Sequence, residues 1–553
     1  MQTSRERVFF RMVLPGLCLA LAVGCSVDGW EAKRAAAVNR VRPLVYNTDG
    51  CDMLYWPTNL PVSVANFTDR RLKFALGTPI TTVSYCPQSA GFGHFTCRKA
   101  GEPLTNTVTA AHYGNPSARN AAQDFFDLGT DALEMATAFC RTNDLEVFVS
   151  IRFNDQHDGS SKPGDLNALY PPFKVAHPDC LMGALDPKSP RSKELYEDYA
   201  GWSCVNFDEK PVREHMKRFV RELVTNYDVD GIEYDFNRHF MIFRSVATGG
   251  VATRDEIAKM TQLMRDLKAI TEEVGRKKSR PIVIAMRMPD SVEYDLAVGA
   301  DIETWFREKL VDIWIGGGYF QLNQWETSVT LAHRYGIRFY ASLDESRIGR
   351  AVTRRGLRMI PGRMTVPFYA ARMSAALAAG CDGVYVFNIE NDFLHEVASI
   401  NLGAASEKCY FAVDRGSDGY RPDHWLKGGW RYNRMPTLDP GGNCSAEHPF
   451  GDGQVKPMSG GESYSFEVAL GDDFVGSVQP KATAEVLTNL KGGAVTLTVN
   501  GRAVGPASVR DGLFAFGLPA DSLHKGLNAF TVTFPADVPA GTTFNDFAVR
   551  VVR

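Results

Sequence analysis

Two carboxylates stand two positions apart in the segment Val-Asp-Gly-Ile-Glu-Tyr-Asp-Phe-Asn-Arg-His, residues 229–239. Side chains along a β-strand alternate between its faces, so Glu233, Asp235 and Asn237 are expected together on one face. Two carboxyl groups this close do not ionise independently, and burying them without partners is costly. One protonated and one ionised carboxyl group would suit acid–base cleavage of a glycosidic bond.

More polar residues stand at or just beyond the ends of other β-type runs. Arg152 and Asn154 alternate with apolar residues, and Arg287 ends a later run. We expect them near the acidic pair, with Asp344 or Glu390 as nucleophile or base. The residues expected to contact a substrate are Arg152, Asn154, Asn237, Arg238, His239, Arg287, Tyr319, Tyr340 and Asn388.

The same charges also have a purely structural interpretation. Arg152 and Arg287 could neutralise Glu233 and Asp235 merely to hold the fold together, and the two later acids could be solvated loop residues. Buried ion pairs seldom improve stability over apolar residues of similar size. This many polar groups in one place therefore favour a functional site.

Two further sets of residues are ambiguous. His157 and Asp158 could contact substrate, bind a metal or lie on the surface; the sequence places no third ligand, so no metal and no cofactor are predicted. Aromatic residues could give sugar rings a platform, although core packing is the commoner outcome for Trp314. The candidate platforms are Trp314, Tyr319, Phe320, Trp325 and Tyr340.

Eight short β-type runs recur between residues 42 and 392. Residues 212–226 and 254–276, which flank the fourth run, carry apolar residues at helical spacing. Alternating strands and helices imply parallel strands, so we predict a (β/α)8 barrel with the acidic pair facing its axis. The predicted strands are Pro43–Asn47, Ile80–Cys86, Leu145–Phe153, Gly231–Phe236, Pro281–Met286, Asp312–Ile315, Ile337–Ser342 and Gly383–Phe387.

An open doubly wound sheet is the alternative arrangement. No Gly-x-Gly-x-x-Gly motif or P-loop follows the first predicted strand. The three glycines at 316–318 lack the lysine and the helix-opening pattern of a phosphate-binding loop, so they are interpreted as a tight loop.

Helical spacing stops after about residue 456, where short alternating segments separated by glycine and proline predict a small β-sandwich. This module could bind carbohydrate, but bracing of the barrel is favoured. Residues 407–445 are predicted to link the two parts. The domain prediction is a signal at 1–25, a linker at 26–41, a barrel with a C-terminal extension at 42–455 and a sandwich at 456–553. The predicted sandwich strands are Ser463–Val468, Ala494–Val499, Leu513–Gly517, Ala529–Phe534 and Phe544–Val552.

The first 25 residues have the parts of a secretory signal. Three arginines precede an apolar run, residues 13–23, that is too short to span a bilayer. The run ends in Leu-Ala-Val-Gly-Cys, similar to a bacterial lipobox, so Cys25 is a candidate lipidation site, with an ordinary cleavage site as the alternative. We expect an exported protein that is periplasmic, anchored to the outer membrane or extracellular.

Cysteine content fits that compartment without fixing the pairing. Nine cysteines remain after the signal, so one or more disulfides are plausible, with an odd thiol left over. Buried unpaired thiols are an equal alternative for Cys140 and Cys381, which lie in apolar stretches.

Charge and hydropathy exclude other classes. The 61 basic and 64 acidic residues give a net charge of −3, so no nucleic-acid partner is predicted. Beyond the N-terminus no apolar run is long enough to span a membrane, which leaves the lipid anchor as the only predicted membrane contact.

At these residues the chain resembles the bacterial glycosyl-hydrolase-10-like barrels, secreted or lipid-anchored proteins presumed to act on polysaccharides. The resemblance covers roughly residues 42–440 and rests on the Asp-Gly-Ile-Glu-Tyr-Asp run, on Ser-Ile-Arg-Phe-Asn-Asp at 150–155 and on Trp-Leu-Lys-Gly-Gly-Trp-Arg-Tyr at 425–432. It implies a glycosidase whose catalytic acids match Glu233 and Asp235.

The run is also similar to the chitinase-type pattern Asp-Gly-x-Asp-x-Asp-x-Glu. Here Glu233 replaces the second Asp and Asn237 replaces the final Glu, the proton donor, which argues against a substrate-assisted mechanism. Our hypothesis makes Glu233 the general acid and Asp235 its electrostatic partner.

Two other functions stay open. The missing glutamate at 237 favours a non-catalytic carbohydrate-binding surface lipoprotein that retains the barrel. A metal-dependent hydrolase or lyase is the third alternative.

Overall fold

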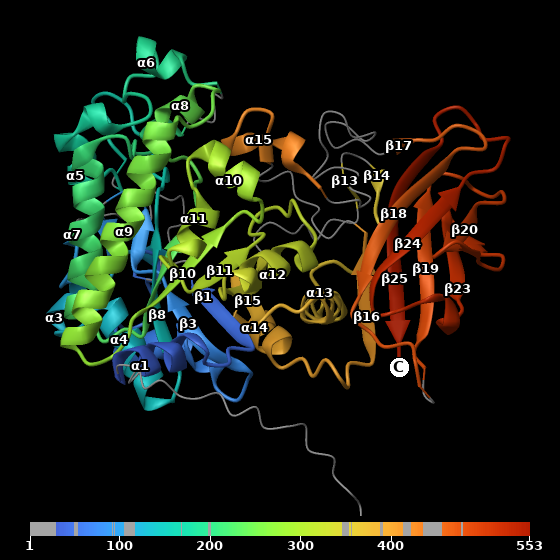
Figure 1. The fold of residues 1–553 in the computed structure, drawn as a ribbon, viewed down its shortest axis with the longest axis horizontal. Coiled ribbons are helices and arrows are strands. Elements are labelled where there is room, and N and C mark those ends of the chain that lie inside the picture. The colour runs from blue at the N-terminus through green and yellow to red at the C-terminus, as the bar shows by residue number, and fades with distance from the viewer. Residues whose placement is uncertain are drawn as a thin grey trace, which may run out of the picture.

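Eight parallel strands close into a barrel in which neighbours in space are neighbours in sequence (Figure 1). The computed structural model describes residues 29–48, 53–90, 92, 94–103, 117–167, 169–196, 201–344, 353–354, 357–387, 391–412, 422–434, 456–476 and 479–553. All eight predicted strands are confirmed. They are β1 (Leu44–Thr48), β3 (Ile80–Tyr85), β8 (Glu146–Arg152), β9 (Gly231–Asp235), β10 (Val283–Met288), β11 (Ile313–Gly316), β12 (Arg338–Asp344) and β15 (Gly383–Phe387).

Helices surround this barrel, and both predicted helices are present as α7 and α9. Helix α9 begins with a capping box, in which Thr253 and Glu256 bond each other's backbone amides, and it ends at Lys277. The helices of this region are α2 (Val64–Arg71), α3 (Ala122–Asp127), α4 (Ala132–Thr142), α5 (Pro172–Ala176), α6 (Pro190–Lys193), α7 (Lys210–Asn226), α8 (Arg244–Ala247), α9 (Arg254–Lys277), α10 (Val292–Val298), α11 (Ile302–Arg307), α12 (Trp325–Arg334), α13 (Val366–Ala378) and α14 (Asn391–Ala398). Short strand pairs occupy the loops: β2 (Trp56–Pro57) with β7 (Ala118–Arg119), β4 (Gln88–Ala90) and β6 (Glu102–Pro103) with β5 (His94–Phe95), and β13 (Thr353–Arg354) with β14 (Leu357–Arg358).

Side chains of β9 alternate as the sequence predicts. Ile232 and Tyr234 are fully buried in the apolar layer between barrel and helices. A separate apolar cluster fills the barrel interior, and it receives residues from six of the eight strands: Val45, Phe148, Val283, Ala285, Ile313, Ile315, Tyr340, Tyr385 and Phe387. The interior therefore has its own packing, distinct from the outer layer.

The N-terminal end of the barrel is filled by an ion pair and covered by a helix. Arg42 bonds Glu146 through Nε at 2.6 Å and Nη2 at 2.7 Å, inside the ring of strands. Helix α1 (Gly29–Val38) packs outside, where Arg34 Nη2 bonds Asp312 at 2.7 Å. The prediction of a linker at 26–41 was therefore wrong for residues 29–38, which form an alanine-rich helix that Arg34 holds to the barrel.

The C-terminal module is the predicted β-sandwich of two antiparallel sheets. One sheet has the order β16-β25-β19-β23-β22, with β17 also paired to β25, and the other has the order β18-β24-β20-β21. The five predicted strands are present as β18, β20, β23, β24 and β25, whereas β16, β17, β19, β21 and β22 were not predicted. The strands are β16 (Glu407–Phe411), β17 (Lys456–Pro457), β18 (Ser463–Leu470), β19 (Lys481–Thr488), β20 (Thr496–Val499), β21 (Arg502–Ala503), β22 (Ser508–Arg510), β23 (Leu513–Leu518), β24 (Gly526–Thr533) and β25 (Thr543–Val552).

Strand β16 corrects the predicted boundary between the two parts. It lies in the stretch predicted as a link, yet it pairs along its whole length with β25 in the sandwich. The chain then returns to the barrel as α15 (Pro422–Trp425), where the Trp425 ring lies 5.6 Å from the rings of Tyr319 and Phe320. The two parts are therefore interleaved in sequence.

Sandwich and barrel share a buried polar contact. Arg363 donates from Nη1 and Nη2 to the two oxygens of Asp546 at 2.8 and 2.9 Å, and its guanidinium lies 4.0 Å from the ring centre of Phe411. Asp546 also accepts the Ile360 amide at 2.9 Å. Figure 1 shows α13 and β16 between barrel and sandwich. This contact supports the bracing role expected for the sandwich.

The cysteines differ from the expectation of disulfides. In the part of the chain that the structure describes, Cys97, Cys140, Cys180, Cys204, Cys381 and Cys409 are buried free thiols, and Cys86 is buried. Cys18, Cys25, Cys51 and Cys444 lie outside it. Among the described helices, none combines the length and apolar composition needed to cross a bilayer.

One buried acid lacks any compensation within the described structure. Asp295 on α10 is fully buried, neither of its carboxylate oxygens has a hydrogen-bond partner, and burial with nearby Asp290 and Glu293 raises its pKa well above the usual value. We expect Asp295→Leu to stabilise the protein by about 1–3 kcal/mol at pH 8 in urea unfolding, because an apolar residue there needs no partner.

The matched variant Asp295→Asn separates the cost of ionising the buried side chain from the cost of burying a polar group there. Asparagine removes ionisation but stays polar, so it should abolish the pH dependence of Asp295 and gain less than leucine. A raised native pKa means that stability from this group is lost as the pH rises through it. Loss of stability in the leucine variant would contradict the prediction.

Candidate active site

Glu233 lies at the centre of the barrel, fully buried, with hydrogen-bond donors from four different strands. Its Oε1 accepts from Asn47 at 2.9 Å, from Ser150 at 2.7 Å and from the Tyr385 hydroxyl at 2.9 Å. Ser84 donates to Oε2 at 2.7 Å. Burial first, and then the charge of Asp235, raise the pKa of Glu233 to about 7. Glu233 is therefore a proton-holding group near neutral pH.

Asp235 lies one layer nearer the mouth and is paired with an arginine. Arg287 Nη1 contacts both carboxylate oxygens, at 2.9 and 3.0 Å. Burial raises the pKa of Asp235, while Arg287, Arg238 and Arg152 oppose that rise. The direct contact with Arg287 favours negative charge on Asp235 and the shared proton on Glu233.

The strand register fixes these two layers. Glu233 is level with Ser150 and Ala285 on the neighbouring strands, whereas Asp235 is level with Arg152 and Arg287. Because β9 runs toward the mouth, Asp235 is the carboxyl group of the pair that faces it. Both side chains point into the barrel, as their alternation predicts.

Arg287 is enclosed by aromatic rings. Its guanidinium lies 4.4 Å from the ring centre of Phe387, 5.2 Å from that of Tyr319 and 5.8 Å from that of Tyr385. These rings hold the guanidinium against Asp235 through cation–π contacts. Tyr319 is the candidate aromatic platform that the structure places beside the acidic pair.

A hydrogen-bonded chain of side chains crosses the loops above the pair. Arg152 donates to Asp155 Oδ2 at 2.8 Å, and His157 Nδ1 lies 2.7 Å from Asp155 Oδ1. Arg238 lies 2.9 Å from His157 Nε2 and donates to the Tyr319 hydroxyl at 3.1 Å. The chain joins the ends of β8, β9 and β11. His157 was a candidate from the sequence, whereas the central place of Asp155 in this chain was not predicted.

Asp155, His157 and His239 each offer one atom that can bind a metal, and these three atoms lie within 4.8 Å of one another. Their surroundings do not suit a cation. Arg238 occupies Nε2 of His157 with an N–H donor, so metal at Nδ1 would leave two N–H groups facing each other. Metal-bound histidines instead donate their other N–H to an acceptor. We therefore assign no metal to these residues.

Two residues expected to contact substrate have structural roles instead. The Asn154 amide nitrogen donates to the backbone oxygens of Val205 and Met241 at 2.9 and 2.6 Å, and its oxygen accepts the Val205 amide at 3.1 Å. Asn154 therefore joins two loops. Tyr340 faces the interior as predicted, but it lies in the layer of Arg42 near the opposite end of the barrel. Strand alternation fixes a face and not a depth.

The other aromatic candidates belong to the core. Trp314 is fully buried between the rings of Phe306 and Phe339, at 5.3 and 4.9 Å. Trp325 lies 5.9 Å from Phe339. Phe320 packs on Trp425.

Asn237, where the chitinase-type pattern has its acid, is almost fully buried. Its Nδ2 has no hydrogen-bond partner among the described residues. A Cβ at Gly318, whose φ is +46°, would lie 2.0 Å from that nitrogen, so only glycine fits there. The tight glycine loop predicted after β11 is confirmed. Its Gly318 allows the backbone to pass close to Asn237.

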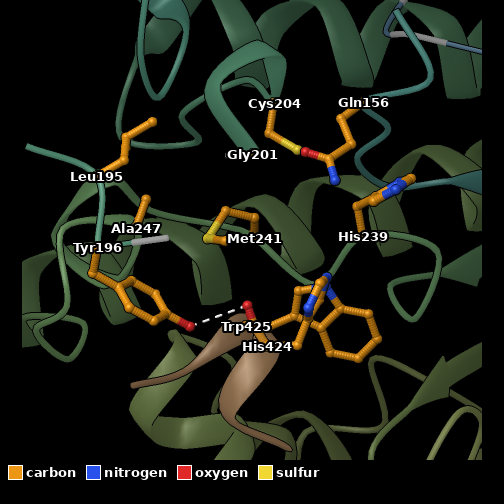
Figure 2. Close-up of a pocket in the computed structure, with 10 residues that line it drawn as sticks. All are labelled: Gln156, Leu195, Tyr196, Gly201, Cys204, His239, Met241, Ala247, His424 and Trp425. Atoms are coloured by element: carbon orange, nitrogen blue, oxygen red, sulfur yellow. Dashed lines mark hydrogen bonds between the residues drawn. The ribbon is translucent and has the colours of Figure 1, made fainter. Parts of the chain in front are cut away.

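His239 lies beside His157, with ring centres 5.3 Å apart, and burial holds its pKa well below the usual value. It lines a cavity of about 20 Å³, room for about one water molecule. Figure 2 shows Cys204 and Gln156 on one side of this cavity and His424 and Trp425 on the other. This cavity is too small for a sugar ring.

Several predicted site residues are not described. Asn388, Glu390 and Cys25 lie outside the described residues, and for Asp344 only the backbone, at the end of β12, is described. The structure adds Asn47, Ser84 and Tyr385, which bond Glu233 from β1, β3 and β15. All three lie on predicted strands, and the alternation of side chains along those strands could have placed them inside the barrel.

The raised pKa of Glu233 gives a stability prediction. The group binds its proton more tightly in the folded state, so its contribution is complete below about pH 4 and is lost as the pH rises through about 7. We expect the stability of the wild type, measured against Glu233→Gln by urea unfolding, to fall by about 3 kcal/mol between pH 4 and pH 9. A difference independent of pH would contradict this.

The fold and site define a (β/α)8-barrel protein with a C-terminal β-sandwich and a buried Glu–Asp–Arg cluster in the barrel. No family model and no curated protein matches the chain. Among solved structures, the PgaB (BpsB) glycoside hydrolase domain from Bordetella bronchiseptica is similar, with a TM-score of 0.38, 11% identity and coverage of 65% of this chain and 99% of that chain.

Two more solved structures are similar at the same level. The glycoside hydrolase family 18 N-acetylglucosaminidase from Paenibacillus barengoltzii has a TM-score of 0.33, 12% identity and coverage of 65% of this chain and 98% of that chain. A bacterial fucosidase has a TM-score of 0.34, 10% identity and coverage of 92% and 96%. Such values establish neither family nor substrate, and the relation to the glycosyl-hydrolase-10-like group stays a prediction.

Proposed function

We propose that the protein is a glycoside hydrolase that acts on a poly- or oligosaccharide outside the cytoplasm. The observation that carries the proposal is the pair inside the barrel: Asp235 bound by Arg287, directly above Glu233, whose pKa is raised to about 7. Neighbouring carboxyl groups with different protonation are the arrangement that glycosidic cleavage uses.

In the proposed mechanism Asp235 is the ionised group. Arg287 keeps its charge, and that charge stabilises the positive character that develops at the anomeric carbon as the bond breaks. Glu233, one layer below, holds its proton so that the pair carries one negative charge. Asp235 keeps the electrostatic role expected from the sequence. Glu233 is bonded on all sides and has no exposed surface, so the general-acid role expected for it passes to another carboxyl group.

Protonation of the leaving oxygen then needs a second carboxyl group at the mouth. Asp344 and Glu390 remain the candidates, because β12 and β15 end at the same rim as β9. Export and lipid anchoring at Cys25 belong to the proposal and rest on the first 25 residues.

A carbohydrate-binding protein without turnover is the second candidate. Asn237 in place of an acid, together with the complete burial of Glu233, favours it. It predicts glycan affinity with no released sugar.

Incubating the purified protein with a panel of neutral and anionic polysaccharides tests the proposal. Released reducing ends that disappear in Asp235→Asn support hydrolysis, whereas binding without release supports the second candidate. Activity that is lost on chelation would favour the metal-dependent alternative. Neither release nor binding across the panel would overturn both proposals.

A further inference from the structure

His157 stands between an acid and an arginine in the loop after β8. Its Nδ1 lies 2.7 Å from Asp155 Oδ1, and its Nε2 lies 2.9 Å from Arg238 Nη2. Asp155 is completely buried and Arg238 almost so, whereas the His157 side chain is 37% exposed. The ring is thus the solvent-facing member of a buried polar chain.

Hydrogen-bond chemistry fixes the protonation of the two ring nitrogens. A guanidinium has donors only, so His157 Nε2 must accept from Arg238. The ring proton then resides on Nδ1 and is donated to Asp155. Although burial would raise it, the pKa of Asp155 lies well below its usual range because His157 and Arg152 contact the carboxylate. Each ring nitrogen of His157 is therefore engaged, Nδ1 with Asp155 and Nε2 with Arg238.

Arg238, which His157 holds, shares its surroundings with Arg287. Both guanidinium groups lie over the ring of Phe387, at 6.0 and 4.4 Å, and both contact Tyr319. The charged groups that act on Asp235 are Arg287, Arg238, Arg152 and Glu233. Of these arginines, Arg238 lies within hydrogen-bond distance of a histidine, His157.

We propose that His157 is a positioning residue that holds the Arg238 guanidinium beside Asp235 and thereby sets the pH range in which the site works. The inference rests on the proposed hydrolase function and adds to it. His157 itself transfers no proton. It acts on Arg238, because its Nε2 accepts a hydrogen bond from the guanidinium. Loss of that acceptor frees Arg238 to move away, which raises the pH at which Asp235 loses its proton.

Two amide substitutions separate the contacts of the ring. Glutamine can place an oxygen near the position of Nε2, and so can still accept from Arg238. Asparagine can place an N–H near the position of Nδ1, and so can still donate to Asp155. We expect kcat/KM to fall about 30-fold in His157→Asn, which loses the hydrogen bond to the Arg238 guanidinium, but only about three-fold in His157→Gln, because the proposal assigns the effect on Asp235 to the Arg238 contact.

The pH profile distinguishes positioning from simple structural support. In His157→Asn the low-pH limb of kcat/KM should move to higher pH, while in His157→Gln it should stay within about 0.3 units of the wild type. Equal losses in both variants, or a larger loss in glutamine, would overturn the inference. Arg238→Met should lose as much activity as His157→Asn, and the two changes combined should lose no more.

A readout that needs no turnover keeps the inference separate from the proposed function. Urea unfolding of the wild type, His157→Asn, Arg238→Met and the double variant measures the coupling of the two side chains directly. The cycle built on His157→Asn, which removes the acceptor for Arg238, should give a clear coupling energy, whereas a cycle built on His157→Gln, which keeps it, should give a value near zero, even if every glycan is left intact. No coupling energy in the asparagine cycle would overturn the inference, whatever the activity.

Discussion

Replacing Asp235 by asparagine is expected to lower kcat/KM by about 10³-fold or more, with the fold intact. Asparagine has the same shape but carries no charge, so it can neither balance Arg287 nor stabilise a developing positive charge at the barrel mouth. The loss should fall on kcat more than on KM, because the interaction strengthens in the transition state. Steady-state kinetics on the glycan identified by the panel measures it.

Glu146→Gln supplies the matched control. Glu146 is also a buried acid inside the barrel and also pairs with an arginine, but it lies at the N-terminal end. Its substitution should affect thermal stability and leave kcat/KM within about three-fold of the wild type. An Asp235→Asn variant as active as this control would remove Asp235 from the mechanism.

The second large effect is expected on stability, when the buried ion pair between barrel and sandwich is broken. Asp546→Ala leaves the Arg363 guanidinium buried without its acid and the Ile360 amide without its acceptor. The loss of one partner from a buried ion pair costs about 3–5 kcal/mol. We expect a decrease of that size in the free energy of unfolding, measured with urea by intrinsic fluorescence.

The exposed pair of Arg265 and Glu308 provides the comparison. Its Nε–Oε2 distance of 2.7 Å is as short, but both side chains are more than a third exposed, so Glu308→Ala should leave Tm unchanged within error. Arg363→Met should match Asp546→Ala, and the double variant should recover part of the loss. Purely additive losses would mean that the two residues act separately.

The barrel and the direction of its acids were predictable because they depend on local patterns. Apolar runs bounded by turns mark strands, and alternation along 231–235 requires that Glu233 and Asp235 share a face. With eight such runs, closure is the arrangement that leaves no open edge. All eight strands accordingly lie within three residues of their predicted ends.

Depth and partnership were not predictable, because they depend on contacts between distant segments. The height of Tyr340 in the barrel is set by its pairing with Gly383, and the four donors on Glu233 come from strands up to 186 positions away. Asn154 bonds loop backbone that no pattern in its own segment announces. The cysteines are a similar case. Disulfides were expected from the predicted signal, but whether a thiol is buried in the core depends on the packing of distant segments.

Strand β16 has a consequence for synthesis. It is translated directly after the barrel, but its hydrogen-bonding partner β25 is translated only after the other strands of the sandwich. At about 5–20 residues per second, β16 waits on the order of ten seconds with an unpaired edge. A nascent chain stalled between these two strands would leave the paired edge of β16 and the side chain of Tyr410, which belongs to the sandwich core, without their cover, so a pause in this interval favours misassociation of β16.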